Sequence, residues 1–78
     1  MSPITPTNEA LGHAVREVRT SKGLSQEELA HRSGLHPTYI SGIERGLRNP
    51  TWHSLSRVCE ALEVRMSELA ALAERDGT

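Results

Sequence analysis

The sequence has no phenylalanine, one tryptophan, one tyrosine and one cysteine among its 78 residues. Because aromatic residues are so few, the hydrophobic 36% must form its core mainly from leucine, isoleucine, valine and alanine, which suits packed helices. The single cysteine, Cys59, excludes an internal disulfide and leaves no cysteine pair with metal-ligand spacing. A chain of this length forms one domain with a small core, so self-association would help to stabilise it.

Long hydrophobic runs are also absent. The N-terminus has no apolar run typical of a signal peptide, and no stretch approaches the roughly 20 apolar residues that cross a bilayer. We therefore expect a cytoplasmic, unexported protein without a membrane segment, where a lone thiol stays reduced.

Arrangements that would support catalysis or metal binding are missing as well. The four histidines do not pair at three- or four-residue helical spacing, and no acid or cysteine completes a ligand set around them. No nucleophile, base and orienting group occur in a recognisable motif. We expect no metal, no cofactor and no enzymatic activity.

The formal net charge of −1 hides an uneven distribution. Residues 31–57 contain four arginines and one acid, whereas residues 60–78 contain five acids and two arginines. Because surface fields fall off within about 10 Å at ordinary salt, a cationic segment can bind phosphate despite an acidic far end.

Helix-capping and turn residues divide the chain into five predicted helices. After a flexible arm over residues 1–7, the first helix begins at Asn8, with Thr7 or Asn8 as its cap, and ends at Lys22-Gly23. Ser25 and Glu28 form a capping box for a second helix that runs to about Ser33. No segment has the alternation of a strand, so the predicted fold class is all-α.

Three further helices follow. Pro37 occupies the first turn of the third helix, which ends at Arg45-Gly46. Asn49-Pro50-Thr51 opens the fourth helix, which we expect to place Trp52, Leu55, Val58, Cys59 and Leu62 on one side. The fifth helix contains Met66, Leu69 and Leu72. The predicted domain covers residues 8–75.

A helix-turn-helix motif is predicted at about residues 25–45. Two short helices can cross at a steep angle only if the residues at their contact are small or suitably apolar. Ala30 is small at the contact, Gly34 makes the turn, and buried contacts come from Leu29, Leu35, Ile40 and Ile43.

The segment from Leu24 to Leu62, with the strings SQEELA, SGL, YISGIERG and RNPT, resembles the lambda-repressor and Cro (XRE) family of helix-turn-helix regulators. This resemblance implies a compact five-helix DNA-binding domain, similar to stand-alone members such as restriction-modification controller proteins. It further implies double-stranded DNA as the partner, and a homodimer that acts as a repressor or autoregulating controller on an inverted-repeat operator.

The resemblance and the expected helix faces suggest roles for individual residues. Arg19 and Glu44 match a family pair that forms a structural salt bridge. We predict a dimer interface at Met66, Leu69 and Leu72, with closure of the monomer core as the alternative. The DNA-contacting residues are predicted to be Gln26, Arg32, His36, Pro37, Thr38, Tyr39, Ser41, Gly42, Arg45, Arg48, Asn49 and Thr51.

One alternative function stays open at this point. The same fold serves in protein-interaction modules, such as antitoxins or adaptors, whose main task is to hold a partner. RNA polymerase or a toxin-like protein is the additional partner to consider. The cationic segment from Arg45 to Arg48 favours DNA, because contacts to a phosphate backbone require such charge and an adaptor does not.

Overall fold

A computed structural model describes residues 6–76 of the chain, which form five α-helices and no strand within that range. The helices are α1 (Asn8–Ser21), α2 (Gln26–Ser33), α3 (Pro37–Glu44), α4 (Trp52–Leu62) and α5 (Met66–Asp76). The predicted all-α class is confirmed. Residues 1–5 of the predicted flexible arm lie outside the described residues. Within residues 6–76, no helix combines the length and apolar character that crossing a membrane requires.

Side-chain caps begin four of these helices. The Thr7 Oγ1 atom accepts a hydrogen bond from the Ala10 N–H at 3.0 Å, so Thr7 and not Asn8 caps α1. The Ser25 hydroxyl accepts from the Glu28 N–H, and the Glu28 carboxylate accepts from the Ser25 N–H, which completes the predicted capping box. Thr51 caps α4 in the same manner, and His36 caps α3 through its ring nitrogen.

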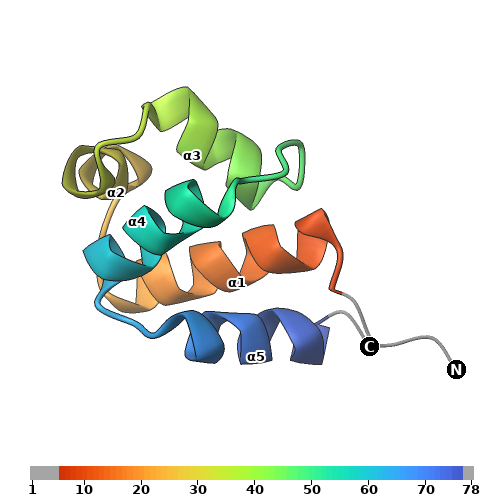
Figure 1. Ribbon diagram of the computed structural model, residues 1–78. Helices are drawn as coiled ribbons and strands as arrows, with labels where there is room; N and C mark the ends of the chain where they lie inside the picture. The colour runs from red at the N-terminus through yellow and green to blue at the C-terminus, as the bar shows by residue number, and fades with distance from the viewer. Residues whose placement is uncertain (1–5, 77–78) are drawn as a thin grey trace, which may run out of the picture.

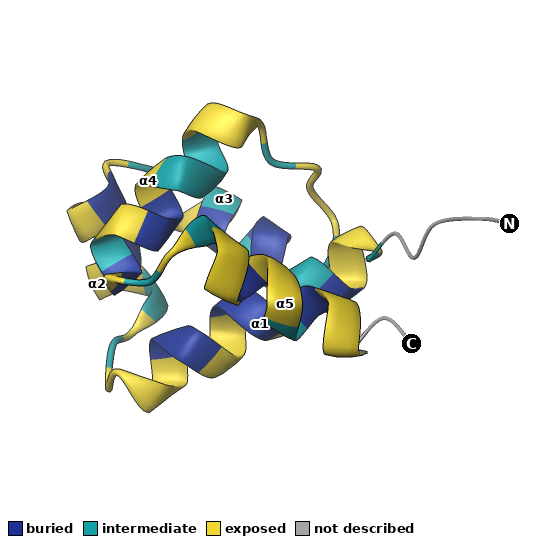
Figure 2. Cartoon of the chain, turned by 60° about the horizontal axis from the view of Figure 1, so that its bottom comes forward, coloured by how far each residue is buried: buried dark blue, intermediate teal, exposed yellow. Residues whose placement is uncertain are grey.

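The helices enclose one hydrophobic core (Figure 2). Figure 1 shows α5 running alongside α1 on one side of the molecule, while α3 lies on the opposite side, beyond α4. The largest fully buried side chains come from all five helices and are those of Leu29, Ile40, Ile43, Leu62, Leu69, Val15 and Val58. The predicted aliphatic core is therefore confirmed, and α3 has an outer face that no other helix covers.

A glycine allows α1 to approach α3 closely. A Cβ atom at Gly12 would clash with the carbonyl oxygen of Ile43 and lie 2.6 Å from the carbonyl oxygen of Glu44. Only a residue without a side chain fits between these two backbones, and this fixes the C-terminal end of α3 on α1.

The predicted interface role of Leu69 is wrong, and Trp52 is far more exposed than the other apolar residues on its side of α4. Leu69 is fully buried, because α5 packs on α1 and uses this side chain to close the monomer core. Leu69 therefore cannot contact a second copy in this conformation. Trp52 is 73% exposed, because it is the first residue of α4 and lies outside the core that Val58, Cys59 and Leu62 enter.

Candidate nucleic-acid interface

The α2–turn–α3 unit presents the outer face of α3 to solvent. Gly34 ends α2 in the left-handed region at φ 73°, and Leu35 then packs against the core. His36, Pro37 and Thr38 are exposed at the N-terminal end of α3, and Ser41 one turn later is half-buried. The His36 Nδ1 atom accepts from the Thr38 N–H at 3.1 Å, so one nitrogen of this ring is engaged in the cap.

A buried ion pair joins α1 to the end of α3. Arg19 donates from Nε to Glu44 Oε2 at 2.6 Å and from Nη2 to Glu44 Oε1 at 3.0 Å. It also donates from Nη1 to the Leu24 carbonyl at 2.8 Å. The hydrogen bonds to Glu44 raise the pKa of Arg19 against the opposing effect of burial. The structure thus brings Arg19 and Glu44 together as a fully hydrogen-bonded pair.

Gln26 extends this network to the start of α2. Its Nε2 atom donates to Glu44 Oε1 at 2.9 Å, and the side chain is half-buried. Glu44 therefore fixes the carboxamide of Gln26 at the N-terminus of α2, the end of a helix that attracts anions.

Arg48 lies across the C-terminal half of α3. Its guanidinium carbon is 5.8 Å from the centre of the Tyr39 ring. A Cβ atom at Gly42 would lie only 2.6 Å from Arg48 Cγ. Gly42, one of the predicted DNA-contacting residues, is therefore buried beneath Arg48 and does not lie on the exposed face of α3.

The remaining predicted contacts flank α3. Arg32 on α2, and Arg45 and Asn49 after α3, are exposed. Thr51 is exposed but its hydroxyl caps α4, where it accepts from the Ser54 N–H and donates to Ser54 Oγ. Because Glu44 is buried against Arg19, the exposed charges from residue 31 to residue 57 are all positive.

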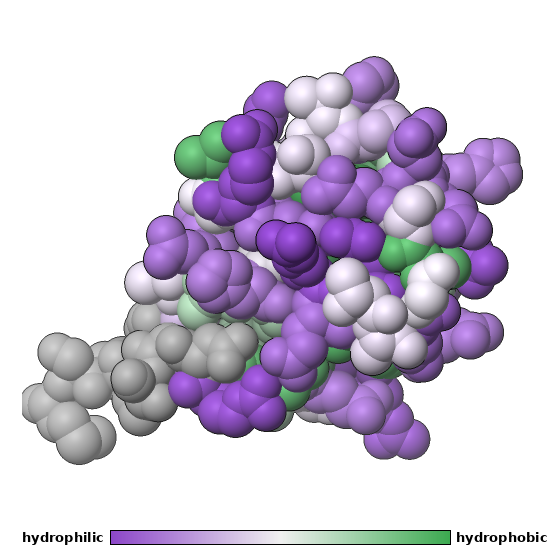
Figure 3. Space-filling model, turned by 180° about the vertical axis from the view of Figure 1, so that it is seen from behind, coloured by the Kyte–Doolittle hydropathy of each residue, from purple (hydrophilic) through white to green (hydrophobic). Residues whose placement is uncertain are grey.

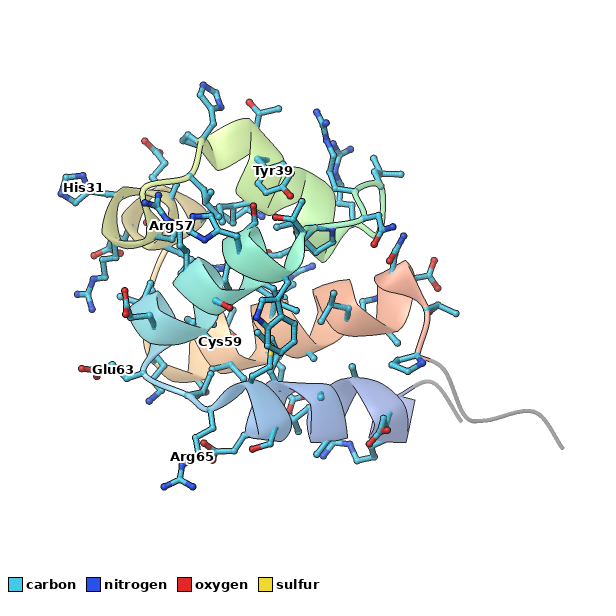
Figure 4. The ribbon with its side chains drawn as sticks, viewed as in Figure 1. His31, Tyr39, Arg57, Cys59, Glu63 and Arg65 are labelled. Atoms are coloured by element: carbon cyan, nitrogen blue, oxygen red, sulfur yellow. The ribbon has the colours of Figure 1, made fainter. Side chains whose placement is uncertain are left out.

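Sequence reasoning assigned no role to Arg57. Figure 4 shows Arg57 reaching from α4 toward α2. Its Nη1 atom donates to the Ser33 carbonyl at 3.4 Å and would lie 2.8 Å from a Cβ at Gly34. Arg57 thus places positive charge at the C-terminal end of α2, where the helix dipole favours it. The only feature of the sequence that pointed to Arg57 is that it belongs to the cationic segment of residues 31–57.

Two large apolar side chains were also missed as surface features. Leu47, in the loop after α3, is 66% exposed, and Trp52 lies five residues further along. Met66 and Leu72, the other predicted interface residues, are half-buried against the core. The face of the molecule in Figure 3 is predominantly hydrophilic, with apolar side chains in small separate groups.

The crossing of α2 and α3 about Gly34, with the outer face of α3 exposed, defines a helix-turn-helix protein. The Helix-turn-helix family matches residues 15–69, and the chain belongs to this family, as its XRE-type motifs indicate. Its relatives are transcriptional regulators and control proteins, so this is a family of regulators and not of enzymes.

Three similar proteins illustrate the relationship. Control protein C.BamHI of Bacillus amyloliquefaciens is 46% identical over 59 residues, which cover 74% of this chain and 73% of that protein. The restriction-modification controller protein C.AhdI from Aeromonas hydrophila is 44% identical, with a TM-score of 0.78 over 80% of this chain and 94% of that chain. The controller protein C.Esp1396I, 36% identical, was crystallised as a tetramer with its natural 35 base-pair operator; its TM-score is 0.82 over 90% of this chain and 92% of that chain.

Proposed function

We propose that this chain is a sequence-specific DNA-binding transcriptional regulator, a dimeric repressor or autoregulating controller that acts in the cytoplasm. The observation that carries the proposal is the uncovered outer face of α3, with exposed arginines on either side of it. In helix-turn-helix proteins the second helix of the motif enters the major groove, and the first crosses the backbone.

Base readout in this scheme comes from the N-terminal half of α3. His36, Thr38 and Ser41 offer hydrogen-bond donors or acceptors to base edges, and Pro37 offers an apolar surface. None of them makes the bidentate contact of an arginine or glutamine, so DNA shape and deformability contribute to the choice of site.

Backbone contacts come from the residues around α3. Arg32, Arg45, Arg48 and Asn49 are exposed and have donors that suit phosphate oxygens. Gln26, held by Glu44, lies at the N-terminus of α2, where the side chain and the free N–H groups of the helix can contact a further phosphate. Thr51 contributes to phosphate binding by capping α4. The free N–H groups at the start of α4 form the positive end of that helix, which attracts a phosphate.

The proposal includes a homodimer whose two α3 helices reach successive major grooves about 34 Å apart, on an inverted repeat. The tetramer of the related C.Esp1396I on its operator supports self-association. The surface we assign to it runs from Trp52 on α4 to Met66 and Leu72 on α5. Trp52 and Cys59 share one side of α4, and the Cys59 Sγ atom lies 3.9 Å from Met66 Sδ, so this side leads onto α5.

The binding test uses the DNA directly upstream of the protein's own gene. Fluorescence anisotropy compares this duplex with a random duplex of equal length at two salt concentrations. We expect tight, salt-sensitive binding to the upstream duplex, with a stoichiometry of two chains per site. Equal affinity for both duplexes would contradict autoregulation and send the search for the operator elsewhere in the genome.

The dimer test is sedimentation of wild type and the Trp52→Ser variant without DNA. We expect a dimer for wild type and a weaker dimer for Trp52→Ser, with Leu47→Ser as the control that removes a similarly exposed apolar side chain. A monomer at all concentrations for wild type would contradict the dimer. Absence of binding to any DNA would favour an antitoxin or adaptor, for which a toxin-like protein or RNA polymerase is the partner to test.

A further inference from the structure

Arg48 is held in place although it makes no hydrogen bond with any residue from 6 to 76. Its guanidinium lies 5.8 Å from the Tyr39 ring centre, within the range of a cation–π contact. Its aliphatic stem lies on Gly42, where even one methyl group would overlap it. The five N–H donors of Arg48 therefore stay available while its position is constrained.

The residues beneath Arg48 are themselves fixed. Tyr39 is half-buried and packs against the core next to Ile40, and Gly42 is buried within α3. An exposed arginine normally loses much rotamer freedom when it binds a ligand. Here the folded protein has already restricted that freedom, which favours any ligand that matches the fixed position.

We propose that Tyr39 and Gly42 form a seat, the Arg48 seat, that holds the Arg48 guanidinium in position to bind a DNA phosphate. Tyr39 acts through the face of its ring and not through its hydroxyl. Both are positioning residues, and neither contacts DNA in this scheme. The inference rests on the proposed DNA-binding function.

Phosphate is the ligand that the location of Arg48 favours. Arg48 follows the C-terminal end of α3, whereas the N-terminal part of such a helix meets base edges. The planar guanidinium presents paired N–H groups that match two phosphate oxygens. The contact is therefore independent of sequence, and random DNA can report it.

The test measures anisotropy with a fluorescein-labelled random duplex of about 30 base pairs, at salt concentrations between about 50 and 200 mM. Arg48→Ala should weaken binding and reduce the slope of log affinity against log salt by about 0.9, the value for one phosphate. Arg65→Ala, which removes an equal charge near the start of α5, should leave both quantities unchanged.

The Tyr39 variants separate ring from hydroxyl. Tyr39→Phe keeps the ring and should bind like wild type. Tyr39→Leu should bind about two- to fivefold more weakly with an unchanged salt slope, since Arg48 keeps its charge but loses the cation–π contact. In the Arg48→Ala background, Tyr39→Leu should cause no further loss of DNA affinity. A general loss of structure would instead lower the affinity equally with and without Arg48.

Gly42→Ala provides a variant that does not depend on loss of packing. Alanine is the better helix former, and the three nearest atoms that its Cβ would meet belong to the flexible side chain of Arg48. The thermal midpoint should equal or exceed that of wild type, while DNA binding weakens about as much as in Tyr39→Leu.

Three results would overturn the Arg48 seat. Binding by Tyr39→Phe as weak as by Tyr39→Leu would assign the contact to the hydroxyl. An equal effect of Tyr39→Leu with and without Arg48 would leave only a structural role. Full binding by both Tyr39→Leu and Gly42→Ala would show that Arg48 needs no seat, with the proposed function intact. Failure of wild type to bind any DNA would instead remove the proposed function together with the seat.

Discussion

The carboxylate of Glu44 holds Arg19 through two hydrogen bonds, and both side chains are nearly buried, with 2% and 11% of their surfaces exposed. Arg19 belongs to α1 and Glu44 ends α3, so the pair fixes the helix proposed to enter DNA against the longest helix of the molecule. Gln26, at the start of α2, donates a hydrogen bond to the same carboxylate and so joins α2 to the pair.

Glu44→Gln should destabilise the protein strongly. Loss of one partner leaves the Arg19 charge buried and unpaired, which costs about 3–5 kcal/mol in comparable pairs. Urea denaturation measures the free energy of unfolding. The control is Glu17→Gln, which removes the exposed partner of Arg75 and should cost less than about 1 kcal/mol. Similar losses in the two variants would contradict a special role for the buried pair.

Gly12→Ala should also lower the free energy of unfolding, by at least about 2 kcal/mol. The added methyl group meets backbone atoms of Ile43 and Glu44, which cannot rotate away, and this outweighs the better helix propensity of alanine. Gly23→Ala is the comparison. A Cβ at residue 23 would have no neighbouring atom within 4 Å, so the only strain is that of alanine at a positive φ. That strain costs about 1 kcal/mol, so a larger loss in Gly23→Ala than in Gly12→Ala would refute the close contact.

Thr38→Ala should change the choice among DNA sites and leave binding to random DNA almost unaltered. Thr38 is exposed on the outer face of α3 and carries no formal charge, so the salt dependence should stay that of wild type. We expect discrimination between the operator and single-base variants to fall by about 1 kcal/mol at one position. A competition assay with a library of operator variants measures this. An unchanged ranking of all variants would exclude Thr38 from base readout.

Glu28→Gln should flatten the acid dependence of stability. Hydrogen bonds from the Ser25 N–H and hydroxyl lower the pKa of Glu28. A lowered pKa in the folded state stabilises the fold above the ordinary glutamate pKa of about 4.3, and this contribution is lost as the pH falls through the lower folded value. Urea midpoints at pH 7 and pH 3 should therefore differ less in Glu28→Gln than in wild type. Glu27→Gln, in the same helical turn, should retain the wild-type difference.

Cys59 should resist alkylation in the native protein. Its side chain is buried in α4, and burial raises the pKa of the thiol, so the reactive thiolate is scarce. Iodoacetamide at pH 8 should react more than about a hundredfold faster in denaturant than under native conditions, since reaction requires opening of the core. Equal rates in the two conditions would mean that α4 and α5 separate readily.

Local signals were enough to predict most of the fold. The cap at Ser25 with Glu28, the turn at Gly34 and the proline at the start of α3 each follow from the chemistry of a few neighbouring residues, and the structure has all three. The aliphatic core followed from helical periodicity in the same way. Family motifs then supplied what periodicity cannot, namely the pairing of Arg19 with Glu44 across 25 residues.

The errors concern packing between segments that are distant in the sequence. Gly12 and Gly42 gave no local indication of what lies above them, because Ile43 and Arg48 approach only in the folded state. Leu69 was predicted at a dimer interface, but the position of α5 on α1 buries it in the core. Trp52 lies outside the core because it is the first residue of α4. The role of Arg57 at the α2 turn likewise depends on how α4 crosses α2.

The exposure of Trp52 gives the protein a built-in spectroscopic reporter. It is the one tryptophan of the chain, and 73% of its surface meets solvent. Its fluorescence therefore reports a single environment, which is aqueous for an isolated chain and becomes apolar when another surface covers the indole. In the proposed dimer, whose interface includes Trp52, dilution would thus shift the emission spectrum as the subunits dissociate, and a dilution series would give the association constant.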